Sequence, residues 1–115
     1  MKWALFLSLL LVGRGEPMWI PRGTPVPAGL VRVQINDCCG SMKPAIQGGE
    51  IAFAEIVTPW TVLKVGDIVD TGVHTHRITA LNERAVLTSG DNNRWADGWT
   101  LRKDLKFVIR YVQRP

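Results

Sequence analysis

One serine, two histidines and two aspartates are spaced along this chain in a way that suits nucleophilic catalysis. Ser41 lies in the stretch Gly40-Ser41-Met42-Lys43-Pro44, directly after an apolar segment. Gly40 lets the backbone adopt angles that other residues avoid, and Pro44 prevents a strand from continuing past it. The turn therefore presents a hydroxyl that a substrate can reach, although a serine in an ordinary tight turn has the same local pattern.

A serine hydroxyl needs a base to remove its proton near neutral pH, and a neutral imidazole suits that task. The two histidines, His74 and His76, lie two residues apart on an expected strand. Both side chains should therefore face one side of the sheet, with Thr75 facing the other. An acid that holds the imidazole in one tautomer would complete a triad, and Asp91 and Asp97 in the following polar stretch are the candidates.

The same histidine pair raises the alternative of a zinc site, because imidazole nitrogens and cysteine thiolates are zinc ligands. The cysteines of the chain, Cys38 and Cys39, are adjacent, whereas zinc sites usually space theirs about two to four residues apart. Adjacent cysteines also rarely form a disulfide with each other. We therefore expect no metal and no other cofactor, and we expect His74 to be a bystander.

Length and composition limit the chain to one small domain. Its 115 residues, 46% of them apolar, suffice for a modest core. Eleven Gly and seven Pro indicate many turns, and the net charge of +4 is spread along the chain. A nucleic-acid-binding protein usually concentrates its basic residues on one element, so this class is disfavoured. The charge allows only a mild preference for anionic surfaces such as lipid headgroups.

The apolar patterning predicts a mainly β domain. Residues 30–35 alternate, with Val31, Val33 and Ile35 facing inward, which indicates a half-buried strand that leads to Ser41. Residues 50–57 suit a strand or a helix, and the flanking Gly-Gly and Pro favour the strand. Further strands are expected over residues 67–71, over 73–80 and 84–88 as a hairpin, and over 105–112, with a polar loop at 90–98.

The first 29 residues precede the expected domain. Residues 1–15 contain ten residues that are apolar except for Ser8, which is the length of the apolar core of an export signal. A spanning helix needs about 20 apolar residues, so we expect a signal or a short anchor, with a buried helix as the alternative. Residues 16–29 contain four prolines and indicate an extended linker. Residues 30–115 are the expected catalytic domain.

Four stretches in this order resemble the signal peptidase family, in the branch of archaea and the endoplasmic reticulum that uses Ser, His and Asp. They are Gly40-Ser41-Met42-Lys43-Pro44-Ala45, Val65-Gly66-Asp67-Ile68-Val69, His76-Arg77-Ile78, and Thr88-Ser89-Gly90-Asp91-Asn92-Asn93 together with Asp97. The bacterial branch and the more distantly related self-cleaving repressor peptidases have a lysine where this chain has His76. The resemblance covers residues 39 to about 110, and the histidine assigns the branch.

The resemblance implies a role for each matching residue. By position, Ser41 is the nucleophile, His76 the general base and Asp97 the triad acid. Asp91 is also required in the family pattern, either for holding the loop and the histidine or as the alternative acid.

The residues around the serine are candidates for the oxyanion hole or for substrate contacts. In the bacterial branch the residue two positions before the nucleophile helps to form the oxyanion hole and is commonly a small hydroxyl residue. Cys39 stands there in this chain, and a thiol is a weak donor. Gly40 and Met42 are the other candidates.

The implied protein is a serine endopeptidase with a small, antiparallel, partly barrel-like signal-peptidase-type β domain. It would cleave extended peptides or preproteins after small residues, at a membrane surface or exported, with a membrane-anchored partner chain as an option. The peptide would pair with strand edges near residues 33–37 and 69–74. The alternative is a catalytically silent peptide-binding module or an accessory protein of an envelope or viral assembly. A self-cleaving repressor is disfavoured because the lysine base is missing.

Overall fold

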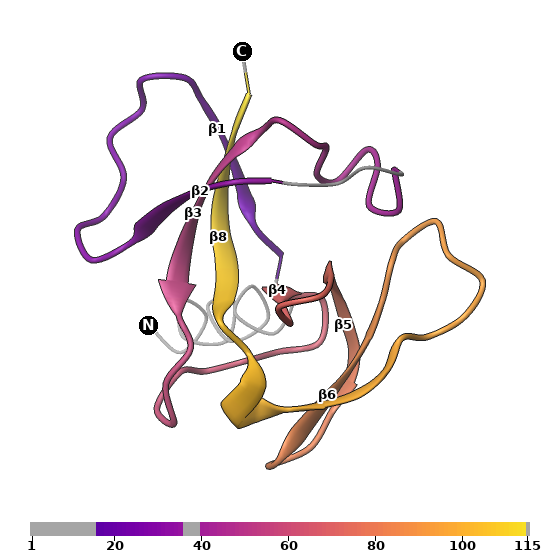
Figure 1. Cartoon of the computed structure of the whole chain (residues 1–115). Helices are drawn as coiled ribbons and strands as arrows, with labels where there is room; N and C mark the ends of the chain where they lie inside the picture. The colour runs from indigo at the N-terminus through magenta and orange to yellow at the C-terminus, as the bar shows by residue number, and fades with distance from the viewer. Residues whose placement is uncertain (1–15, 36–39, 115) are drawn as a thin grey trace, which may run out of the picture.

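The computed structural model describes residues 16–35 and 40–114, and these residues form one β-sheet without an α-helix (Figure 1). The strands are β1 (Met18–Pro21), β2 (Val31–Gln34), β3 (Ile51–Ile56), β4 (Ile68–Asp70), β5 (Thr75–Leu81), β6 (Ala85–Ser89), β7 (Gly98–Leu101) and β8 (Phe107–Arg114), with a short 3₁₀ turn, η1 (Arg102–Asp104), before β8. Neighbouring strands are antiparallel except for the parallel pair of β1 and β8. The prediction of a mainly β domain is confirmed.

Strand β8 organises the sheet. The strand order is β2-β3-β8-β4-β5-β6-β7, and β1 also pairs with β8. One edge of β8 pairs with β3 along residues 107–113, whereas the other edge pairs with β4 over 107–109 and with β1 over 111–114. Figure 1 shows β8 in yellow running through the middle of the molecule. The sheet of the described strands is open, so the expectation of a partly barrel-like domain is not supported.

The central strands β4 and β8 are buried on both faces of the sheet. Adjacent side chains of a strand point to opposite faces, so Ile68 packs in one apolar cluster and Val69 in a second one. Likewise, Ile109 of β8 packs in the first cluster and Val108 in the second. The first cluster is completed by Ile35, Met42, Ile46, Ala52, Ala54 and Val112, and the second by Leu63, Ile78, Val86 and Leu105. These two cores support the elements that carry the candidate site residues.

Most of the expected strands form. In β2 the inward residues Val31 and Val33 are half-buried and Arg32 is exposed, as the alternation predicts. Residues 51–56 form a strand, and β5 and β6 form the expected hairpin.

Two short strands were not expected. Strand β1 lies within the segment expected to be a linker, and its pairing with β8 makes it part of the sheet. Pro21 ends it, which suits a strand that pairs along a single edge. Strand β7 begins where the polar loop was expected to end and pairs with β6.

One expected substrate edge is already occupied. Residues 68–70 of β4 pair with β5 on one side and with β8 on the other, so the edge predicted near residues 69–74 has no free side there. Beyond β4, the Thr71 N–H donates to the His74 carbonyl at 2.8 Å and closes a turn. By contrast, β2 is the outermost strand at its end of the described sheet, next to β3 alone.

A buried carboxylate precedes β4. Asp67 is 3% exposed and accepts a hydrogen bond from the Lys64 N–H at 2.9 Å, with Arg110 Nη1 at 3.7 Å from it. Burial raises the pKa of Asp67 above its ordinary value of 3.8. These contacts give Asp67 a structural role at the start of β4.

The apolar segment 1–15 and the expected oxyanion residue Cys39 lie outside the described residues. Within residues 16–35 and 40–114, no helix has the length and apolar character needed to cross a membrane.

Candidate active site

Ser41 and His76 come together from distant parts of the chain. Ser41 Oγ lies 3.1 Å from His76 Nε2, within hydrogen-bond distance. His76 is 5% exposed near the start of β5, and Ser41 is half-buried. An imidazole whose Nε2 carries no proton can accept the proton of the serine hydroxyl. The pair therefore has the geometry of a nucleophile and its base.

A carboxylate lies on the other side of the imidazole ring. His76 Nδ1 is 2.6 Å from Asp97 Oδ2, and the Asp97 side chain is only 12% exposed. When the carboxylate accepts the Nδ1–H, the proton is held on that nitrogen and Nε2 is left to accept from Ser41. The three side chains thus form one continuous series of hydrogen-bond contacts, as in a Ser-His-Asp triad.

The second candidate aspartate makes a different contact. The Asp91 carboxylate accepts two hydrogen bonds from Arg77, at 2.9 Å from Nε and 3.0 Å from Nη2. Arg77 Nη1 also donates to the Gly66 carbonyl at 2.9 Å. The hydrogen bond to Asp91 raises the pKa of the Arg77 guanidinium. Of the two aspartates, Asp97 contacts His76, and Asp91 ties the loop after β6 to β5.

The turn that carries Ser41 is held by the loop after β6. The Asn92 N–H donates to the Ser41 carbonyl at 2.8 Å. The Asn92 side-chain amide donates to the carbonyls of Gly40 and Lys43, each at 2.7 Å. In Figure 1 this loop, drawn in orange, lies on the same side of the molecule as the turn that follows residue 40. The Gly-Asp-Asn motif thus supplies one anchor to β5 and another to the serine turn.

Two glycines leave room around Ser41. Gly40 has a φ of 72°, in the left-handed region that favours glycine, so the special backbone angle expected there is present. A Cβ atom on Gly90 would lie 3.0 Å from Ser41 Cβ and 2.7 Å from Asn93 Nδ2. Only a glycine therefore fits at position 90 without moving its neighbours.

The Met42 side chain does not lie where a substrate or oxyanion contact was expected. It is fully buried in the first apolar cluster, and its sulfur accepts the Asp91 N–H at 3.3 Å. The side chain anchors the turn in the core instead of facing a substrate. Gly40 stays at the half-buried surface of the turn.

Sequence reasoning missed the role of Thr88. Its hydroxyl donates to Asp97 Oδ2 at 2.8 Å, and its carbonyl accepts the Asp97 N–H at 2.8 Å. Thr88 is fully buried on β6, on the same face as Val86. A hydroxyl at an inward position of an apolar strand was the available signal, because a buried hydroxyl needs a hydrogen-bond partner.

His74 packs on the candidate base. The two imidazole rings are stacked, with centroids 4.6 Å apart and planes inclined by 8°. The prediction that His74 and His76 face the same side is therefore confirmed. His74 itself is exposed.

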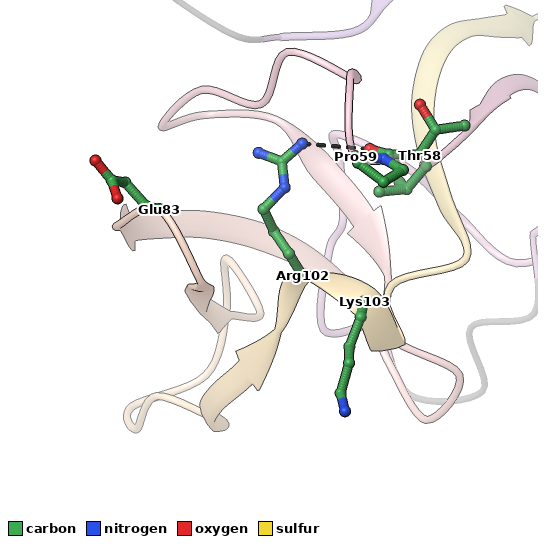
Figure 2. Close-up of a pocket in the computed structure, with 6 residues that line it drawn as sticks. Thr58, Pro59, Glu83, Arg102 and Lys103 are labelled. Atoms are coloured by element: carbon green, nitrogen blue, oxygen red, sulfur yellow. Dashed lines mark hydrogen bonds between the residues drawn. The ribbon is translucent and has the colours of Figure 1, made fainter.

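Two cavities lie apart from these residues. One has a volume of about 400 Å³ and is lined by Val57, Thr58, Pro59, Glu83, Arg102 and Lys103 (Figure 2). In Figure 2 Arg102 points toward Thr58, while Glu83 and Lys103 point away from it. The other, of about 290 Å³, is lined by Arg22, Gln47, Gly48, Gly49, Glu50, Ile51 and Gln113. Neither lining includes a member of the Ser-His-Asp group.

Comparisons of the chain with models of known protein families, with curated proteins and with solved structures found no match.

Proposed function

We propose that this protein is a serine endopeptidase of the signal-peptidase type. Ser41 is the nucleophile, His76 the general base and Asp97 the acid that orients it. The observation that carries the proposal is the series of contacts from Ser41 Oγ to His76 Nε2, at 3.1 Å, and from His76 Nδ1 to Asp97 Oδ2, at 2.6 Å. The order of the four motifs supports the signal-peptidase type.

The first half of the reaction forms an acyl-enzyme. His76 Nε2 removes the hydroxyl proton as Ser41 Oγ attacks the carbonyl carbon of the scissile peptide bond. The Asp97 carboxylate stabilises the imidazolium that forms. Collapse of the tetrahedral intermediate breaks the carbon–nitrogen bond, and His76 gives its proton to the departing amine. The peptide on the amino side of the cut stays attached to Ser41 as an ester.

The second half releases that peptide. A water molecule gives a proton to His76 Nε2 and attacks the ester carbonyl. The carbon–oxygen bond to Ser41 then breaks, and the proton on His76 returns to the serine oxygen. His76 is 5% exposed and the Asp97 side chain 12% exposed, and limited access of water strengthens the interaction between the imidazolium and the carboxylate.

An extended peptide is the substrate class that suits the fold. The outer edge of β2 can accept a further strand, and β2 leads along the chain toward Ser41. A membrane surface is the proposed setting, with the domain exported or outside the cytoplasm. Trp60, Val62 and Val65 support this setting because all three are exposed in the segment between β3 and β4, and such apolar side chains favour the lipid interface.

The test is cleavage of peptides with small residues before the cut, followed by mass spectrometry of the products. The full chain is incubated with each peptide, with and without vesicles of anionic lipid, beside Ser41→Ala. We expect the parent to cleave and Ser41→Ala to be slower by about 10³-fold or more. Vesicles are expected to increase the rate. Equal cleavage by both proteins would contradict the role of Ser41, and no cleavage by a folded parent on several peptides would favour the peptide-binding module.

Thr88→Val is expected to lower kcat/KM by about tenfold, because Asp97 then loses a hydrogen bond from a neutral donor to its charged oxygen. Thr88→Ser keeps the hydroxyl and should retain most of the activity. The pH dependence of kcat/KM is measured for both, since a residue that acts through Asp97 and His76 shifts that profile. Equal losses in the two variants without any shift would assign Thr88 to packing alone.

A further inference from the structure

His74, His76 and Asp97 form a group of metal-ligand side chains at the candidate active site. One ligand atom from each lies within 4.8 Å of the other two. Two imidazoles and a carboxylate are ligands that zinc accepts, and zinc sites with three protein ligands leave the fourth position to water. We propose that this group binds one Zn²⁺ ion and that the bound ion blocks the triad.

The third ligand comes from the fold. In the sequence, the adjacent cysteines disfavoured a zinc site. In the structure, Asp97, 21 residues after His76, places its Oδ2 2.6 Å from His76 Nδ1 and can be the third ligand. The Thr88 hydroxyl, at 2.8 Å from Asp97 Oδ2, holds that carboxylate in place. A hydrogen-bond donor of this kind commonly orients a carboxylate that binds a metal.

His74 is the ligand that must move. Zinc–nitrogen bonds are about 2.0–2.1 Å long, so ligand atoms of a tetrahedral site lie roughly 3.3 Å apart. In the stacked arrangement the ring planes are nearly parallel, and the lone pairs, which lie in those planes, do not converge on one point. His74 is exposed, so its ring has space to rotate toward the ion.

A bound ion would exclude the catalytic contacts. A metal binds a lone pair of the imidazole, and both ring nitrogens of His76 already have a partner, Ser41 at Nε2 and Asp97 at Nδ1. An ion on Nε2 prevents the ring from accepting the serine proton, and an ion on Nδ1 separates it from the aspartate. Zinc is therefore an inhibitor here and not a cofactor. This consequence depends on the proposed function, whereas binding of the ion does not.

The experiment is calorimetric titration of ZnCl₂ into the full chain. The background is Cys38→Ser with Cys39→Ser, because thiolates are themselves zinc ligands. We expect one ion per chain, with affinity lower by about tenfold or more when His74→Ala is added. Thr75→Ala is the matched control, because Thr75 lies between the histidines and faces the other side. MgCl₂ should not compete, since Mg²⁺ prefers oxygen ligands.

Several results would overturn the proposal. One is zinc affinity that His74→Ala leaves unchanged. Another is the loss of zinc binding when Cys38 and Cys39 are replaced by serine. If the parent cleaves peptide, Zn²⁺ must inhibit it at the concentration at which it binds, and a chelator must restore the rate; binding without inhibition refutes the blocking step. If the parent cleaves no peptide, the proposed function fails, while calorimetry still decides whether the zinc site exists.

Discussion

Asp97→Asn is expected to lower kcat/KM for peptide cleavage by about 10³- to 10⁴-fold. Asp97 Oδ2 lies 2.6 Å from His76 Nδ1, where a carboxylate accepts the Nδ1–H. An asparagine can place its NH₂ group there, and that group donates to Nδ1. The ring proton then moves to Nε2, so His76 can no longer accept a proton from Ser41. The triad geometry stays, but the imidazole is held in the wrong tautomer.

Asp91→Asn should have a much smaller effect. Asp91 pairs with Arg77, and their side chains are 28% and 21% exposed. Partly exposed ion pairs contribute up to about 1 kcal/mol, which corresponds to roughly fivefold in rate if all of it acts on the site. Asn92 continues to hold the serine turn through its three hydrogen bonds. We therefore expect a loss below about tenfold.

Both variants are measured against the parent with the same peptide. Circular dichroism and thermal unfolding of each variant show whether the fold is kept. A larger loss for a folded Asp91→Asn than for Asp97→Asn would contradict the assignment, because it would make Asp91 the acid of the reaction.

The sequence was sufficient to predict most of the strands and insufficient for β1 and β7. In β2 and in the β5–β6 hairpin, alternating apolar residues reflect a face that is buried over several positions. Strands β1 and β7 are as short as β2, but their apolar residues do not mark a buried face, since Met18, Trp19, Trp99 and Leu101 are all exposed. Pro21 and Gly98 are also residues that disfavour strands. These two strands form because β8 and β6 offer them an edge, which is a tertiary effect.

The choice between the aspartates depends on one of these missed strands. A polar loop over residues 90–98 gives Asp91 and Asp97 similar freedom, so spacing alone cannot separate them. In the structure Gly98 is the register partner of Thr88, and Thr88 is in turn the partner of Ile78 on β5. Pairing of β7 thereby sets the residue just before it beside β5, close to His76. Strand β7, which has no clear signal in the sequence, is therefore the element that positions Asp97 beside His76.

Gly90→Ala is expected to lower kcat/KM by about 100-fold although it removes no group of the triad. The added Cβ would lie 3.0 Å from Ser41 Cβ and 2.7 Å from Asn93 Nδ2, closer than such atoms pack. The turn is tied to the same loop through Asn92, so the strain passes to Ser41. A displacement near 1 Å between reacting groups costs about 100-fold in rate.

A substitution of Asn93 distinguishes the two contacts that could cause this strain, the one with Asn93 and the one with Ser41 Cβ. Its amide is the end of a flexible side chain, so Asn93→Ala removes the nearer clash and should by itself leave kcat/KM close to that of the parent. The double variant with Gly90→Ala keeps the contact with Ser41 Cβ and should stay almost as slow as Gly90→Ala alone. Full recovery would mean that the clash falls on Asn93, and the position of Ser41 would then not depend on a glycine at residue 90.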